Sequence, residues 1–168
     1  MSAQRKPIGF EYEFEFERPD GAIEVCSMCN LVPLPAINHM AASLFGDVAA
    51  IGTFHVGIFS ANYLPSIGAV AADIPGVIGE FTGYSEATRP VWTRVNSDGL
   101  ITNGASRAAF TVTQNVRLYG GFLCSASAKG SGDGLLLSIA RFPTPRDVEA
   151  GTTIRVRGEL SLIPTNVA

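Results

Sequence analysis

The residues best suited to chemistry are three cysteines and two histidines. Cys26 and Cys29 have the C-x-x-C spacing that metal sites and dithiol redox sites use. A zinc site needs four ligands, but Cys124, His39 and His55 lie at no spacing typical of a zinc finger. A redox motif would begin a helix, which lowers the thiol pKa, whereas Asn-Leu-Val-Pro follows here. We interpret these cysteines as small, partly buried side chains and expect no metal and no cofactor.

Hydrolytic and phosphate-binding chemistry have equally little support. His55, Asp73 and one of many serines could form a triad, but the chain contains no G-x-S-x-G nucleophile elbow. The glycine-rich stretch Gly130–Gly134 lacks the Lys-Ser/Thr of a phosphate-binding loop, and a strand pattern follows it instead of a helix. No pair of carboxylates indicates a glycosidase. The sequence therefore predicts no catalytic residue and a protein that is not an enzyme.

Composition limits the class of protein. The 168 residues are 46% hydrophobic and 16% charged, with a net charge of −3, which fits one domain over residues 1–168 and argues against a nucleic-acid partner. The 18 glycines and 10 prolines favour strands joined by tight turns. The mean hydropathy is positive, at +0.24. A monomer with so few charges would expose apolar patches, so we expect a homo-oligomer, with a trimer as one option.

No segment is typical of a signal peptide or a membrane span. The N-terminal sequence has no apolar core and turns acidic at once. Residues 48–72 carry no formal charge, but they contain His55, Asn62 and Pro65, which a spanning helix disfavours. Three cysteines cannot all pair with one another, so a reducing cytoplasm is the expected place of assembly. We expect no membrane partner.

Strands are the elements that would position any site. Val116–Phe142 predicts a hairpin, with apolar runs at Val116–Cys124 and Leu135–Phe142. The glycines of the intervening SASAKGSGDG supply the positive φ that a reversing backbone needs. The second run is almost entirely apolar, which predicts a strand buried on both faces at the centre of a sheet. Pro143 and Pro145 are expected to end it.

The rest of the chain predicts one helix and further short strands. The helix spans Pro35–Phe45, with Gly46 at its C-cap. Four residues form its apolar face: Ile37, Ala41, Leu44 and Phe45. Strands are expected near residues 23–31, 53–60, 106–113 and 152–163, and a long ordered loop, held by neighbouring subunits, at Ala61–Gly79. Together these patterns predict a mainly β fold, an antiparallel β-sandwich of jelly-roll-like type with one short helix.

The segment Phe10–Glu17 alternates strictly between aromatic and acidic residues. Its glutamates, which share one face, are Glu11, Glu13, Glu15 and Glu17. Neighbours on that face lie about 7 Å apart and repel each other. Arg155 and Arg157 repeat with the same period of two on the closing strand.

We therefore predict that the first and last strands pair, within one subunit or swapped onto a neighbour, with glutamates facing arginines. The pairs to test are Glu13 with Arg155 and Glu15 with Arg157. The alternative is a solvated edge strand whose charges discourage aggregation. The hairpin within residues 1–30 is also a candidate to contact neighbouring subunits.

Three segments stand in order along most of the chain from Asn30 onward. The first contains INHMAASLFG and then FHVGIFSANYLP; the second is EFTGYSEATRP, from Glu80 to Pro90. The third is VRLYGGFLCSASAKGSGDGLLLSIARF with the closing VEAGTTIRVRGELSLI. In this order they resemble a family of virion structural proteins of tailed bacteriophages. The resemblance implies a location in the virion, after assembly in the host cytoplasm. It also implies the major capsid protein or other virion proteins as partners, and it carries no catalytic signature.

Within that class we expect a capsid decoration or cement protein, because the chain has no coiled-coil heptads for a fibre shaft. The alternatives are a tail or adhesion component of the virion, and a carbohydrate-binding module that stacks sugars on aromatic rings. An exposed aromatic platform would favour the module, whereas rings buried in subunit contacts would favour decoration. The aromatic candidates are Tyr63, Tyr84, Trp92 and Tyr119. Tyr63, Tyr84 and Trp92 are also candidate interface residues, as are the four glutamates of Phe10–Glu17 and the two arginines of the last strand.

Overall fold

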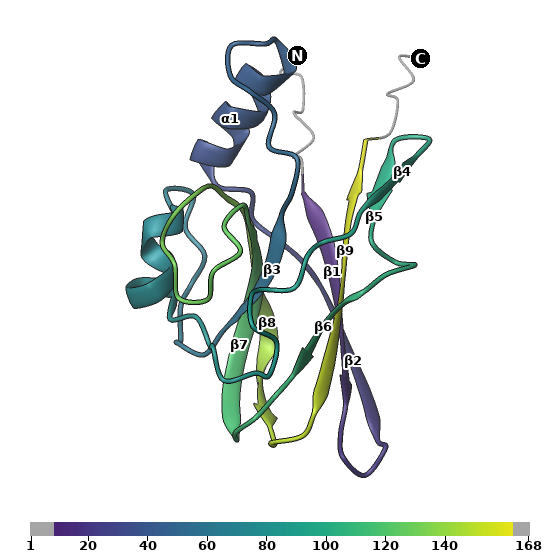
Figure 1. Ribbon diagram of the computed structural model, residues 1–168. Coiled ribbons are helices and arrows are strands. Elements are labelled where there is room, and N and C mark those ends of the chain that lie inside the picture. Colours follow the sequence, from purple (N-terminus) through teal and green to yellow (C-terminus); the bar gives the residue numbers. More distant parts are fainter. Residues whose placement is uncertain (1–8, 163–168) are drawn as a thin grey trace, which may run out of the picture.

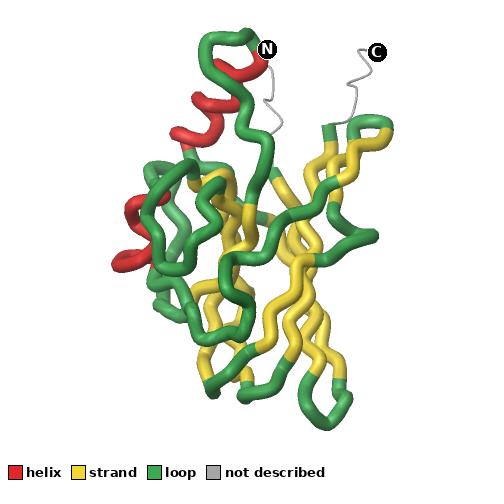
Figure 2. The backbone as a smooth tube through the Cα atoms, viewed as in Figure 1, coloured by secondary structure: helices red, strands yellow, loops and turns green. Residues whose placement is uncertain are grey.

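The computed structural model describes residues 9–162, and these form two antiparallel sheets that pack face to face (Figure 1). The predicted β-sandwich is confirmed. Figure 2 shows that the long loops gather on the side of the smaller sheet. Residues 1–8 of the segment 1–30, and Ile163 of the predicted last strand, lie outside the described residues.

The larger sheet has six strands within residues 9–162 and the smaller sheet has three. The larger contains β1 (Phe10–Glu17), β2 (Ile23–Cys29), β4 (Val95–Ser97), β5 (Leu100–Thr102), β6 (Ala108–Thr111) and β9 (Thr153–Ser161). The smaller contains β3 (His55–Phe59), β7 (Val116–Cys124) and β8 (Leu136–Val148). The helix α1 covers Leu34–Leu44, one residue earlier than predicted at each end. A 3-10 turn, η1 (Ala71–Asp73), and a π turn, η2 (Ile74–Ile78), interrupt the loop that follows β3.

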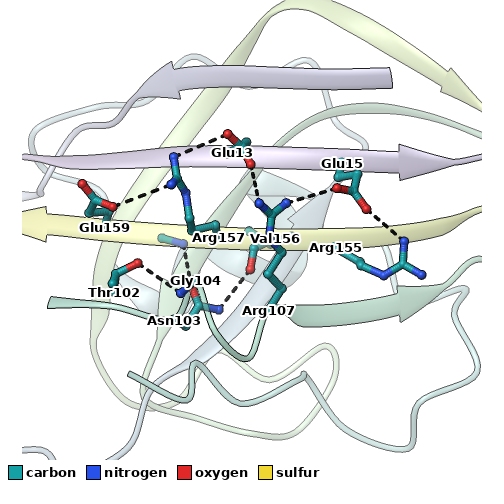
Figure 3. A network of polar contacts seen from close by, with 11 residues as sticks. Glu13, Glu15, Thr102, Asn103, Gly104, Arg107, Arg155, Val156, Arg157 and Glu159 are labelled. Atoms are coloured by element: carbon teal, nitrogen blue, oxygen red, sulfur yellow. Dashed lines mark hydrogen bonds and ion pairs between the residues drawn. The ribbon is translucent and has the colours of Figure 1, made fainter. Parts of the chain in front are cut away.

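The first and last strands lie side by side in the larger sheet. Its order is β2-β1-β9-β5-β4, and β6 also pairs with β9. β5 pairs with the end of β9, and β6 pairs with its beginning. The buried side chain of Asn103 fills the gap between them: its Nδ2 donates to the Val156 carbonyl at 3.0 Å, and its Oδ1 accepts from the Gly158 N–H at 2.8 Å (Figure 3). β9 therefore keeps its backbone hydrogen bonds along both edges.

The aromatic face of β1 fills the space between the two sheets. Phe10, Tyr12, Phe14 and Phe16 are all buried, as their alternation with glutamates predicts. Phe14 and Phe16 meet Phe142 of β8 edge-on, with ring centroids 5.0 and 5.9 Å apart. Such edge-to-face contacts add to the stabilisation from burial.

The predicted hairpin is present as β7 and β8, which pair antiparallel. Three details differ from the prediction. β7, not β8, is the central strand of its sheet. β8 continues through Pro143 and Pro145 to Val148, because the β7–β8 register shifts between Leu118 and Gly120, and prolines are tolerated in such irregular stretches. Only Gly130 and Gly134 of the turn glycines adopt a positive φ.

The smaller sheet is covered on its outer face as well. Ile74 and Ile78 of η2 are fully buried in a second apolar cluster with Phe59 and Phe122. The expected loop Ala61–Gly79 thus contains two helical turns that pack on its own chain. The expectation that neighbouring subunits order this loop stays a prediction. This cover explains why Leu136–Ala140 is buried on both faces.

A buried ion pair joins this cover to the β7–β8 turn. The side chains of Arg89 and Glu80 are 0% and 1% exposed, and their two nitrogen–oxygen contacts are both 2.7 Å. Arg89 also donates to the carbonyls of Ala126 and Ser131, at 2.9 and 2.7 Å, and to the Cys124 sulfur at 3.1 Å. Glu80 accepts a further bond from the N–H of Gly130 at 2.7 Å. No local sequence pattern marks this pair as buried.

Replacing Arg89 by methionine should destabilise the protein by about 3–5 kcal/mol, because Glu80 is then buried without its partner. The matched control is Arg117→Met, which breaks the exposed Arg117–Asp147 pair and should lower the stability far less, because solvent screens that pair. Chemical denaturation of both variants measures the difference. Equal, small losses would show that the buried pair does not hold the β7–β8 turn.

Candidate interaction surfaces

The charged faces of β1 and β9 meet within one subunit (Figure 3). The register sets Glu13 opposite Arg157 and Glu15 opposite Arg155. Arg155 contacts Glu15 at 3.0 Å and Glu17 at 2.6 Å, and Arg157 contacts Glu13 at 3.4 Å. The predicted strand pairing is confirmed, but the partners are exchanged relative to the predicted pairs. The edge-strand alternative is wrong, because β1 lies between β2 and β9.

A third arginine, Arg107, completes this charge ladder. It contacts Glu13 at 2.7 Å and Glu15 at 3.3 Å from the residue before β6. The sequence carried a signal for it: Ala108, Phe110 and Val112 alternate as a buried face, which places Arg107 on the opposite face. We define the charge ladder as Glu13, Glu15, Glu17, Arg107, Arg155, Arg157 and Glu159.

The charges of the ladder are largely neutralised by one another. Hydrogen bonds from Arg155 to Glu17 and Glu15 raise the pKa of Arg155 above its usual value. Four carboxylates face three guanidiniums, so little charge remains for a partner. Glu11 differs from the other glutamates, since it is exposed and lies opposite Glu159, a like charge. The ladder therefore serves the sheet itself, and each of its partly exposed pairs is worth little alone.

The aromatic candidates do not form a platform. Trp92 is buried, with its ring nitrogen donating to the Gly158 carbonyl at 3.2 Å. Tyr84 is buried edge-on against Phe110, at 4.9 Å between centroids. Both rings belong to the core of their own subunit. The prediction that Trp92 and Tyr84 are interface residues is therefore wrong. Tyr63 and Tyr119 are half-buried.

The two cysteines of the C-x-x-C motif lie on β2 and not at the start of a helix. Residues three apart in a strand point to opposite faces. Accordingly Cys26 is buried and Cys29 is exposed, and the two thiols do not face a common site. Within residues 9–162, no group of three or more His, Cys, Asp or Glu side chains is placed to hold a metal ion.

The remaining candidates for chemistry are occupied or buried. The carboxylate of Asp73 accepts a hydrogen bond from the Val70 N–H at 3.0 Å, as part of the η1 turn. Burial lowers the pKa of His55. Burial also raises the pKa of the Cys124 thiol to about 11, although neighbouring Arg89 opposes this shift. A protonated thiol is a poor nucleophile, so Cys124 is not suited to nucleophilic catalysis.

The helix α1 exposes the apolar face that the sequence predicted. Ala36 is its only fully buried residue, whereas Leu44 is 77% exposed and the adjoining Phe45 is 80% exposed. The N–H of Leu34 donates to the Ile67 carbonyl at 2.8 Å, which joins the helix to an equally apolar loop. We define the α1 surface as Leu34, Ile37, Leu44, Phe45, Val48, Leu64 and Ile67, all of them exposed.

A cavity of about 310 Å³ lies between α1 and the sheet ends, lined mainly by apolar side chains that include Met40, Phe10 and Phe54. Figure 1 shows α1 projecting beyond the end of the sandwich. Among residues 9–162, no helix has both the length and the apolar character needed to cross a membrane.

Comparisons with known proteins add no relative. No protein-family model matches the chain, and neither a curated protein nor a solved structure does. The resemblance to phage virion proteins therefore depends on the sequence segments alone.

A double-mutant cycle on Glu15 and Arg155 should show a coupling of about 0.2–1 kcal/mol in the free energy of unfolding. The coupling should shrink at high salt, because partly exposed charges are screened. The control cycle pairs Arg155 with Glu11, which lies on the same strand opposite Glu159. Equal coupling energies in the two cycles would contradict the observed register.

Thiol labelling should separate the three cysteines. At mildly alkaline pH, iodoacetamide should modify Cys29 rapidly in the native protein and modify Cys26 and Cys124 only after unfolding. Peptide mass spectrometry checks the labelling, and rapid native modification of Cys124 would contradict the burial.

Because the folded-state pKa of Cys124 lies above its usual value of 9.0, its neutral thiol stabilises the fold below pH 9, and this contribution disappears as the pH rises toward 11.

Proposed function

We propose that the protein is a structural component of a tailed-bacteriophage virion and, within the virion, a capsid decoration protein. The observation that carries this proposal is the α1 surface, whose seven large apolar side chains on α1, on the residues after it and on the loop joined to Leu34 are all exposed to solvent. Large exposed apolar side chains that gather in one region are typical of protein–protein contact sites. The resemblance of three sequence segments to phage virion proteins supports the class of partner.

Leu44 and Phe45 are the natural anchors of such a contact. Each contributes about 1.5–3 kcal/mol when it passes from water into an apolar pocket of a partner. Association also has a large entropic cost, so one α1 surface gives modest affinity. Several linked copies that bind the capsid together would bind far more tightly than one copy. The gain in affinity from several linked copies favours the expected homo-oligomer. The major capsid protein or another virion protein would be its binding partner.

The two alternatives differ in their support. A tail or adhesion component would use the same α1 surface and is distinguished by its copy number on the particle. A carbohydrate-binding module with an aromatic platform has no support from the aromatic candidates, because Trp92 and Tyr84 are buried in the core.

A double variant, Leu44→Glu with Phe45→Glu, should fold normally and lose particle binding by at least about tenfold. Folding should persist because both side chains are already exposed. The assay is co-sedimentation of the purified protein with particles that lack it, followed by quantitative gel analysis.

The matched control is Ile23→Glu with Val25→Glu, which replaces two exposed apolar residues of β2. This control should bind like the unmodified protein. If it loses binding and the α1 variant does not, the hairpin β1–β2 makes the contact, and the role of the α1 surface is overturned.

A further inference from the structure

β2 is an edge strand whose outer side is open. It ends the larger sheet, and among residues 9–162 no strand pairs with its outer side (Figure 1). The Asn30 N–H donates to the Phe10 carbonyl beyond one end of β2, and the Arg18 N–H donates to the Ala22 carbonyl beyond the other. Because hydrogen-bonded pairs alternate along an antiparallel ladder, the even-numbered residues of β2 bond to β1. The backbone groups of the odd-numbered residues therefore point outward. These outward residues are all exposed: Ile23, Val25, Ser27 and Cys29.

The other sheet edges of the described chain are protected, each by its own feature. β4 has only three residues. β6 is covered, because the Ser85 N–H donates to its Thr111 carbonyl at 2.9 Å, and an isolated bridge to Val91 covers the start of β3. β8 contains Pro143 and Pro145. Shortness, cover and proline are features that keep sheet edges from pairing with other chains.

β2 has none of these three features. It is seven residues long and contains no proline, and its register with β1 is continuous from Ile23 to Cys29. Its outward N–H and carbonyl groups are therefore aligned to accept another strand, which is a common mode of protein recognition.

A second copy of the same chain supplies a strand that fits. Two identical strands can pair antiparallel about a twofold axis, and centring the axis on Cys26 uses the whole length of β2. The four outward residues of each copy then form the hydrogen-bonded pairs. The only charged residue of β2, Glu24, faces an uncharged residue, so no like charges meet. The facing pairs between the two copies are Ile23 with Cys29, Glu24 with Met28, and Val25 with Ser27.

We propose that two copies of the protein pair antiparallel through β2 and join their larger sheets into one. This dimer does not use the α1 surface, so it stands whether or not the proposed function does, and Leu44→Glu with Phe45→Glu should leave it intact. The pairing depends on backbone groups. Ile23→Glu and Val25→Glu would face the uncharged Cys29 and Ser27 of the partner subunit, so that variant should also remain a dimer.

The first test is sedimentation equilibrium of the full-length protein over a range of concentrations, which should give a monomer–dimer equilibrium. Ser27→Pro removes one outward N–H from each copy and keeps the bonds to β1, so it should raise the dissociation constant of the dimer at least about tenfold. Ser27→Ala is the matched control, because it removes the hydroxyl and keeps the N–H, and it should dimerise like the unmodified protein. Thermal unfolding of both variants checks that they fold.

The second test reads the register and does not depend on the proline variant. With an added oxidant, Ile23→Cys should form a disulfide with Cys29 of the partner subunit, because facing residues have Cα atoms about 5.5 Å apart. Within one chain the same two positions lie about 20 Å apart and cannot be bridged. The unmodified protein is the control, since its two Cys29 thiols lie at opposite ends of the paired strands and should not be linked.

The proposal is overturned if the protein remains a monomer at every concentration up to about 1 mM. It is also overturned if folded Ser27→Pro and Ser27→Ala variants dimerise equally well, or if Ile23→Cys gives no more linked dimer than the unmodified protein.

Discussion

The pairing of β1 with β9 is the interaction on which the rest of the structure depends. Its period of two sends four aromatic rings of β1 between the sheets and sends its glutamates to the arginines of the charge ladder. A slip of one residue would exchange these faces and bury the carboxylates, so the register is strongly fixed. Asn103 extends the same pairing, because it lets β5 and β6 share one edge of β9 without leaving buried backbone groups unpaired.

A second constraint acts on the loop-rich side of the smaller sheet. Arg89 and Glu80 are fully buried, and their hydrogen bonds reach the backbone on both sides of the β7–β8 turn. A buried pair of this kind adds little net stability over an apolar substitute, but removing one partner is costly. It therefore fixes one conformation of a segment rich in glycine and serine. The α1 surface, by contrast, leaves seven large apolar side chains exposed to solvent.

The parts of the fold that could be predicted are those that a local pattern of apolar and polar residues indicates. Alternation in Phe10–Glu17 and the apolar runs of the hairpin identified the core strands and the facing charges. Arg89 could not be found this way, because its partners lie up to 42 residues away and nothing local marks it as buried. The helix shows the same limit. Its spacing identified an apolar face, but spacing does not say whether the chain itself covers that face. Trp92 and Tyr84 were misplaced because an aromatic residue in a turn-rich segment fits a surface and a core equally well.

The proposed role of the protein is to decorate a capsid through its α1 surface. Its most direct test is the copy number of the protein in purified phage particles, measured by quantitative mass spectrometry against the major capsid protein. A decoration protein should be present at a fixed ratio, with copies in proportion to the capsomers of the shell. Copies matching only a tail or neck structure, or absence of the protein from the particles, would contradict it.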